Sequence, residues 1–283
     1  MKKAILHRMI EIRLTIVAIL AFLLVPGPAS AEDCDAECQA LRNAQDPLAD
    51  VRAIMTDNTI SFGTADEQTG YGFQVQPVYS IPTENGFNFI ARGVIPIVGV
   101  HNGAAFPKLG PDQIGGTGYT WGISDIILQG FIVPQIENAP IKFGFGPQVS
   151  LRSRTDDAVG GPGWGGGLAA VAFGFAGNLS YGGIVGHHWG EDNFNLTTLQ
   201  PIVFYNTEFL GGSYIGYNNS ITYNWTANAG DRWQVPVGLT VGKTFLLDGG
   251  FAVDANLGGY ALAAHPNGGA DAQVKFGVSV FFP

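Results

Sequence analysis

The chain has 283 residues, of which 46% are hydrophobic and only 13% are charged, and its formal net charge is −9. This length suits one large β-domain, and the charged fraction is low for a soluble protein. The 41 glycines and 12% aromatic residues fit many strands joined by tight turns, and fit a collagen-like or disordered chain poorly. The acidic balance argues against a nucleic-acid partner, because binding phosphate needs clustered Lys and Arg side chains.

Residues 1–31 have the pattern of a cleaved secretory signal peptide. Four basic residues begin it, an apolar core follows at 14–25, and the A-x-A sequence at 29–31 is a cleavage site. The alternative is a membrane anchor, which needs roughly 20 apolar residues. Cleavage would remove those four basic residues and Glu11, so the net charge would fall from −9 to −12. No helical span would remain, and a mature chain that crosses a membrane would have to do so as a closed barrel.

Residues 32–55 form an acidic leader that predicts a short helix or a mobile segment ending near Pro47. It could lie in the periplasm or enter the barrel as a plug. Cys34 and Cys38 form a candidate disulfide, since an exported chain meets an oxidising compartment. On a helix their Cβ atoms would lie about 5–6 Å apart, whereas a disulfide needs about 3.8 Å. Pairing would therefore distort or end that turn.

From about residue 56 onward, apolar and polar residues alternate, which is the period of a strand with one apolar and one polar face. The alternation is clearest at 141–153, 213–225, 232–243 and 272–282. Weaker runs lie at 57–64, 70–81, 87–100, 120–133, 164–175, 178–189, 194–205 and 251–262. The total is even, as in bacterial barrels, and a tilted membrane strand needs roughly 9–11 residues. We expect an all-β, antiparallel, up-and-down transmembrane barrel of about 12 strands with lipid outside.

The connections and the tryptophans fit such a barrel. Long connections at 101–118, 154–163 and 263–270 are expected on the extracellular side, and short ones at 82–86 and 176–177 on the periplasmic side. The tryptophans lie near strand ends, which is typical of an interfacial girdle, the alternative being core packing in a soluble sandwich. They are Trp121, Trp164, Trp189, Trp225 and Trp233.

Polar side chains in the inward phase of the strands are candidates for lining the lumen. In an open lumen they would set solute selectivity, and in a closed one they would pair and fill it. They are Arg92, Asp125, Gln129, Lys142, Gln148, Arg152, Gln200, Asn218, Thr222, Arg232, Gln234, Asp254, Asn256 and Lys275. The apolar residues Ile90, Ile123, Ile127 and Phe204 share these faces and favour small aromatic or amphiphilic solutes.

No catalytic, cofactor-binding or metal-binding pattern stands out. The sequence GPGWGG at 161–166 matches G-x-G-x-x-G, but no helix follows to bind phosphate, so we interpret it as a loop entering a strand. His187 and His188 lie near Glu191 and Asp192, yet adjacent strand residues point to opposite faces and would not converge on a metal. A G-x-S-x-G elbow is missing.

Several segments in order resemble the bacterial MetA-pathway of phenol degradation family, whose members are also named neuromedin U-like or transporters. They are QDPLAD at 45–50, QVQPV at 74–78, IPI at 95–97, GISDI at 122–126, FGP at 145–147, LQP at 199–201, DRWQVP at 231–236 and FFP at 281–283. Ser124 replaces a glycine of the family pattern, Gly186 replaces an asparagine, and the cysteine pair is not a family hallmark.

The resemblance implies an outer-membrane barrel of a Gram-negative bacterium that admits small hydrophobic or aromatic compounds, and it transfers no catalytic residues. The expected partners are outer-membrane lipid, the barrel-assembly machinery through the C-terminal strand, and the solute. We therefore predict a passive channel, not an enzyme. The alternatives are a closed structural barrel or a surface receptor acting through the 101–119 loop, a lumen enzyme acting on lipid, and a soluble secreted sandwich.

Overall fold

The structure is a computed structural model that describes residues 34–64, 67–101, 119–137, 139–208 and 212–283. The expected signal peptide and most of the expected 101–118 loop lie outside these residues. In the described part, no helix is long and apolar enough to cross a membrane.

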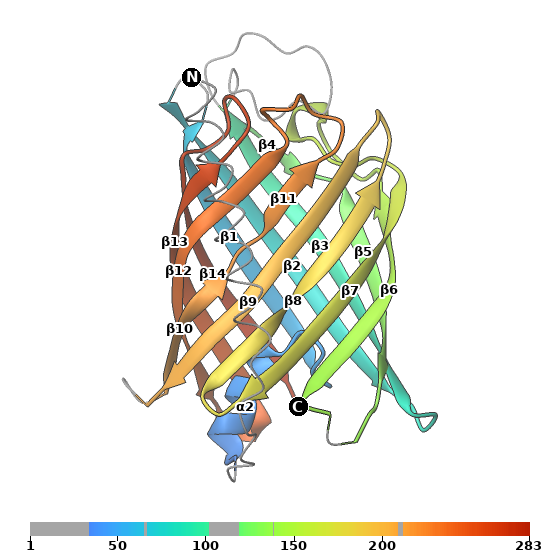
Figure 1. Cartoon of the computed structure of the whole chain (residues 1–283), viewed down its shortest axis with the longest axis vertical. Helices are drawn as coiled ribbons and strands as arrows, with labels where there is room; N and C mark the ends of the chain where they lie inside the picture. The colour runs from blue at the N-terminus through green and yellow to red at the C-terminus, as the bar shows by residue number, and fades with distance from the viewer. Residues whose placement is uncertain (1–33, 65–66, 102–118, 138, 209–211) are drawn as a thin grey trace, which may run out of the picture.

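A single antiparallel sheet closes on itself to form a 12-strand barrel (Figure 1). Closure is made by β1 pairing with β14, and two barrel positions are each occupied by two short strands lying end to end, β4 with β5 and β10 with β11. The strands are β1 (Arg52–Thr64), β2 (Gln68–Pro82), β3 (Phe87–His101), β4 (Tyr119–Ile123), β5 (Ile126–Pro134), β6 (Ile141–Leu151), β7 (Gly165–Ala176), β8 (Leu179–Trp189), β9 (Asn195–Thr207), β10 (Ser213–Asn218), β11 (Ile221–Asn224), β12 (Trp233–Leu246), β13 (Ala252–Ala264) and β14 (Ala272–Phe282).

The twelve alternating runs are confirmed as the twelve strand positions of the barrel. β1 begins at Arg52, earlier than the start near residue 56 that the alternation predicts. Two short 3-10 helices, Asp157–Val159 and Asp248–Gly250, lie in connections.

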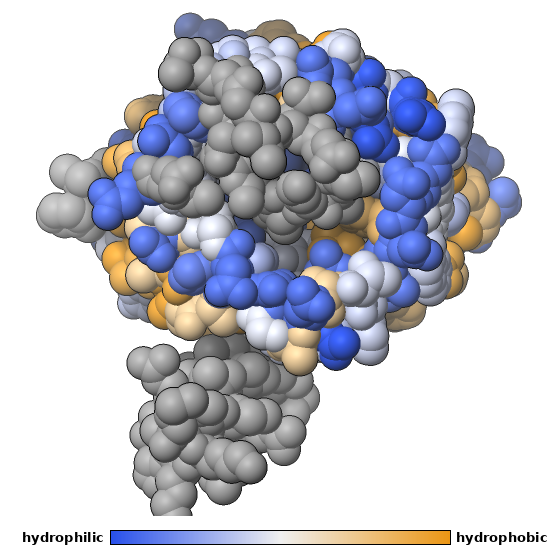
Figure 2. Space-filling model, turned by 90° about the horizontal axis from the view of Figure 1, so that it is seen from above, coloured by the Kyte–Doolittle hydropathy of each residue, from blue (hydrophilic) through white to orange (hydrophobic). Residues whose placement is uncertain are grey.

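The outer surface of the barrel is apolar. On β12, Val237, Leu239 and Val241 are 57%, 57% and 50% exposed, whereas Thr240 is only 4% exposed. On β6, Phe143 and its outward neighbours alternate with buried residues in the same way. From above, hydrophobic residues lie along the flanks and many hydrophilic ones around the rim (Figure 2). An exposed apolar belt of this extent is the opposite of a soluble protein surface.

All five tryptophans lie at the barrel end opposite the N-terminal helix. Each is about half exposed, as expected for an interfacial girdle and unlike core packing in a sandwich. The long connections at 152–164 and 265–271 lie at this same end, and the turns at 83–86 and 177–178 lie at the other. The start of β1 and the end of β14 pair with each other at the helix end (Figure 1).

One irregularity changes which residues face inward. Between β4 and β5 the pairing with β3 shifts by one residue at Ser124 and Asp125, so that Ile123 faces Ile97 whereas Ile127 faces Val94. Ile123 therefore lies on the same outward side as the exposed Trp121, and its expected place on the inner face is wrong. An unbroken period of two cannot anticipate a bulge, which moves every later residue to the other phase.

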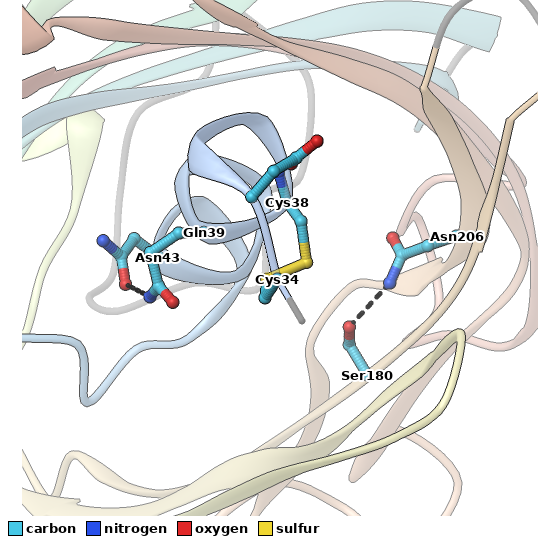
Figure 3. Close-up of a disulfide and its surroundings, with 7 residues drawn as sticks. Cys34, Cys38, Gln39, Asn43, Ser180 and Asn206 are labelled. Atoms are coloured by element: carbon cyan, nitrogen blue, oxygen red, sulfur yellow. Dashed lines mark hydrogen bonds between the residues drawn. A yellow bond between two sulfur atoms is a disulfide. The ribbon is translucent and has the colours of Figure 1, made fainter. Parts of the chain in front are cut away.

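The N-terminal helix α2 (Ala36–Gln45) begins at a side-chain cap and ends before Asp46. Asp35 accepts a hydrogen bond from the backbone N–H of Cys38 at 2.9 Å, which satisfies one of the free donors of the first turn. Cys34 and Cys38 form a disulfide with their Cα atoms 5.3 Å apart (Figure 3). Because Cys34 precedes the helix, the disulfide lies where the helix begins, and of the two expected outcomes the structure shows an ended rather than a distorted turn.

Candidate functional site: the plugged lumen

The segment from α2 to β1 enters the barrel mouth as a plug. Gln45 lies at the end of α2, where its side chain donates to the Asn206 Oδ1 atom at 2.8 Å and accepts from the Ser180 Oγ atom at 2.6 Å. Asn206 and Ser180 belong to β9 and β8 and also bond to each other at 2.9 Å (Figure 3). These contacts hold the end of α2 against β8 and β9.

Two further contacts hold the plug. The Asp46 carboxylate accepts the Lys142 ammonium at 2.8 Å, and its other oxygen accepts the Leu48 backbone N–H at 2.8 Å. Leu48 is 3% exposed and belongs to the same apolar cluster as Phe131 and Val133 on the inner wall. The Lys142 side chain is 51% exposed, so this ion pair is partly screened by water.

A cavity of about 320 Å³ lies between the plug and the inner wall of the barrel. Its size falls at the low end of the roughly 300–1,000 Å³ of small-molecule sites. Its lining is mixed. The apolar part includes Ile90, Phe131, Val171, Phe204 and Phe281, and the polar part includes Asp57, Gln76, Arg92, Asn219, Asp254 and Lys275.

Apart from Asp46 of the plug, the charged groups that line the cavity form two separate sets. In the first set, Lys275 binds the Asp57 carboxylate at 2.9 Å and approaches Asn219 at 3.5 Å. Arg92 interacts electrostatically with Asp57. Its hydrogen bonds within the described part of the chain go to side-chain amides, the Gln76 Oε1 atom at 2.5 Å and the Gln129 Oε1 atom on β5 at 3.4 Å.

In the second set, Asp254 is surrounded by neutral donors. Its carboxylate accepts from the Tyr214 hydroxyl at 3.0 and 3.1 Å, from Thr244 at 3.0 Å and from Asn256 at 3.3 Å. Tyr214 packs against Phe204 with ring centroids 4.7 Å apart. This part of the cavity is therefore aromatic and acidic.

The predicted lumen residues divide into three groups. Half of them line the cavity, namely Arg92, Gln200, Asn218, Gln234, Asp254, Asn256 and Lys275. Gln129 and Gln148 face inward beside the cavity and hydrogen-bond to each other at 2.9 Å, and Gln129 also accepts a hydrogen bond from Arg92. Thr222 faces inward opposite Gln234. The remaining residues, Asp125, Lys142, Arg152 and Arg232, lie toward the two ends of the barrel.

Asp125 fastens a loop and does not line the cavity. It is 1% exposed and binds Arg154 at 2.8 Å. It also accepts backbone N–H groups of Ser153, Arg154 and Gly163, at 3.1, 3.2 and 2.6 Å. This carboxylate is fully occupied in holding the 152–164 connection to the barrel wall.

Two predicted arginines are rim residues. Arg232 donates to the Ala227 carbonyl at 3.0 Å and to the Tyr223 hydroxyl at 3.2 Å, which keeps it in the connection before β12. Arg152 binds Glu191 at 3.4 Å with its side chain 53% exposed. By alternation both side chains are expected to face the lumen. However, Arg152 follows the end of β6 and Arg232 precedes the start of β12, and outside a strand the alternation no longer fixes the direction of a side chain.

Sequence reasoning missed several residues of the site. Asp57 and Gln76 lie in the inward phase of β1 and β2, so alternation could have found them. Gln45 and Asp46 are polar leader residues with no local signal that places them inside a barrel.

The other motifs take no part in a site. His187 bonds to Thr197 at 2.7 Å, whereas His188 bonds to Ser150 at 2.8 Å, so the two rings point to different neighbours. Ser150 is 0% exposed, which closes this serine–histidine pair to a substrate. The G-x-G-x-x-G match lies in a connection that enters β7. Among the described residues, no cluster of His, Cys, Asp or Glu could hold a metal ion.

The comparisons give a structural likeness alone. No family model matches the chain, and no curated protein matches it. An outer membrane channel from Pseudomonas putida F1, known from a crystal structure, is 13% identical with a TM-score of 0.57, and the match covers 84% of this chain and 98% of that one. CdiB from Acinetobacter baumannii is 10% identical over 83% of this chain and 60% of its own, and its TM-score of 0.34 carries no argument. The first likeness supports the barrel fold.

Proposed function

We propose that this protein is an outer-membrane barrel that lets small, largely apolar or aromatic solutes pass through its lumen without an energy source. The observation that carries the proposal is a mixed polar and apolar cavity inside a barrel whose outer surface is apolar. Lipid would cover that surface, with the tryptophans at one interface. The fold shared with a bacterial outer membrane channel adds support.

Passage requires the plug to move. The plug is held by neutral hydrogen bonds of Gln45, one partly exposed ion pair and the packing of Leu48, and none of these is covalent. We place the protein in the outer membrane with the plug on the periplasmic side. The reason is that the plug end of the barrel carries the short turns, the start of the first strand β1 and the end of the last strand β14.

The test is solute entry into liposomes that carry the refolded protein, with a sugar, a small ion and phenol as solutes. Diffusion of phenol through lipid is subtracted with protein-free liposomes. We expect protein-dependent entry of phenol that rises in Gln45→Ala, which loosens the plug, and stays unchanged in Arg152→Gln at the rim.

A closed structural barrel is the second candidate, favoured by the close packing of the plug against the inner wall. It requires that no solute enters through either the wild type or Gln45→Ala. That result would overturn the channel proposal.

A further inference from the structure

We propose that Arg92 is an anion-binding residue and that the solute class of the cavity is a small monocarboxylate with an apolar or aromatic body. This inference deepens the proposed function and rests on it, since it names what the same cavity takes. Three features of the lumen lead to it: an arginine without a carboxylate of its own, a nearby carboxylate that a lysine already binds, and an apolar wall beside the arginine.

The Arg92 guanidinium has no carboxylate of its own within the described parts of the chain. It donates hydrogen bonds to the neutral side-chain carbonyls of Gln76 and Gln129. Its Nε atom is buried and has no partner among the residues that the structure describes. A guanidinium has five N–H donors, and an unpaired charge inside a protein is unfavourable. Arg92 therefore has donors left for a ligand.

Arg92 has to share its nearby carboxylate with another cation. Asp57 is the nearby carboxylate, and it is already bound to Lys275 at 2.9 Å. Two cations thus share one carboxylate, in a chain whose net charge is −9. A carboxylate ligand would balance this charge, and the planar guanidinium suits it because two parallel N–H···O bonds can form.

The apolar wall begins next to Arg92, toward the plug. The register pairs Arg92 with Val78 on one side and Gln129 on the other. Two residues nearer the plug, on the same inward faces, lie Ile90 and Phe131, which are 2% and 3% exposed and share one apolar cluster. A solute with its carboxylate at Arg92 would place its body against this wall.

Another part of the cavity lining limits the ligand to one carboxylate. Asp254 lines the same cavity and already accepts hydrogen bonds from Tyr214, Thr244 and Asn256. A second negative group near Asp254 would be repelled, and the described lining offers it no further unshared cation. The cavity therefore favours monocarboxylates over dicarboxylates.

Binding of benzoate to the full-length protein in detergent at pH 7 tests the inference directly. Benzamide is the uncharged control of the same shape, and acetate is a carboxylate without the body. We expect benzoate to bind at least about tenfold more tightly than either, by isothermal titration, because a charge-assisted hydrogen bond and apolar burial each add affinity.

Three variants identify the residue. Arg92→Gln should bind benzoate no better than benzamide, and the matched variant Arg152→Gln at the rim should behave as wild type. Asp57→Asn should bind benzoate more tightly, because the competing carboxylate is gone. A gain in affinity cannot arise from misfolding, so this variant keeps the test decisive if Arg92→Gln does not fold.

Equal binding of benzoate and benzamide by the wild type would overturn the inference, and so would unchanged preference in Arg92→Gln. Because binding is measured without transport, the carboxylate site and the channel can each be rejected while the other is retained. Benzoate binding without entry into liposomes would retain the site and reject the channel. Entry of phenol without benzoate binding would do the reverse.

Discussion

Each end of the barrel holds one non-strand segment, the 152–164 connection at one end and the plug at the other, and the two are held by different contacts. At the tryptophan-rich end, a buried ion pair between Asp125 and Arg154, together with three backbone N–H groups, fastens the 152–164 connection. At the other end, neutral hydrogen bonds of Gln45, the packing of Leu48 and one ion pair with a half-exposed lysine hold the plug. Breaking a buried, fully bonded charge costs far more than breaking exposed or neutral contacts. The tryptophan-rich end is therefore the fixed end, and the plug end is the releasable one.

The largest effect is expected for Asp125→Asn. The Arg154 side chain is 9% exposed and would keep its charge without an opposite charge beside it. We expect the free energy of unfolding to fall by about 3–5 kcal/mol, the usual cost of breaking a buried pair. Unfolding by urea in detergent measures it, and a loss below about 1 kcal/mol would show that this end is not the fixed one.

A smaller and more local effect is expected for Leu48→Ala. Removing this buried side chain should weaken the docking of the plug by about 2–5 kcal/mol, through lost apolar burial and the space left behind. Hydrogen exchange should then accelerate in α2 while the strands keep their protection. Equal acceleration in the strands would mean that the plug and the barrel unfold together, against the idea of a releasable end.

The smallest effect is expected for Lys142→Gln. The lysine is half exposed, but the Asp46 side chain is only 3% exposed and would keep its charge, with the Leu48 backbone N–H still bonded to it. The loss of the ion pair should therefore cost about 1–3 kcal/mol of plug docking. In the wild type, α2 exchange should increase with salt concentration, because salt screens exposed charges. The variant should lose this salt dependence. A salt dependence that persists in Lys142→Gln would assign it to another charged pair.

The sequence by itself determined the barrel. A period of two with one apolar side requires strands that place each side chain on a fixed face, and 12 such runs without covering helices require closure. The strand positions and the outward side of β6, β12 and β14 therefore follow from local patterns alone. These patterns depend on neighbouring residues, and the backbone geometry of a strand is the same in any fold.

Only the tertiary structure decided what fills the lumen. Gln45 and Leu48 dock the leader against the inner wall of the barrel. Gln45 and its partner Asn206 are more than a hundred residues apart in the chain, and no local pattern encodes such a contact. The phase change at Ser124 and the rim position of Arg232 depend on a bulge and on strand ends. The alternation predicts that Arg92 is a charged residue on the inner face. It cannot predict that Arg92 has no carboxylate of its own, because ion pairing depends on distances across the barrel and not along the chain.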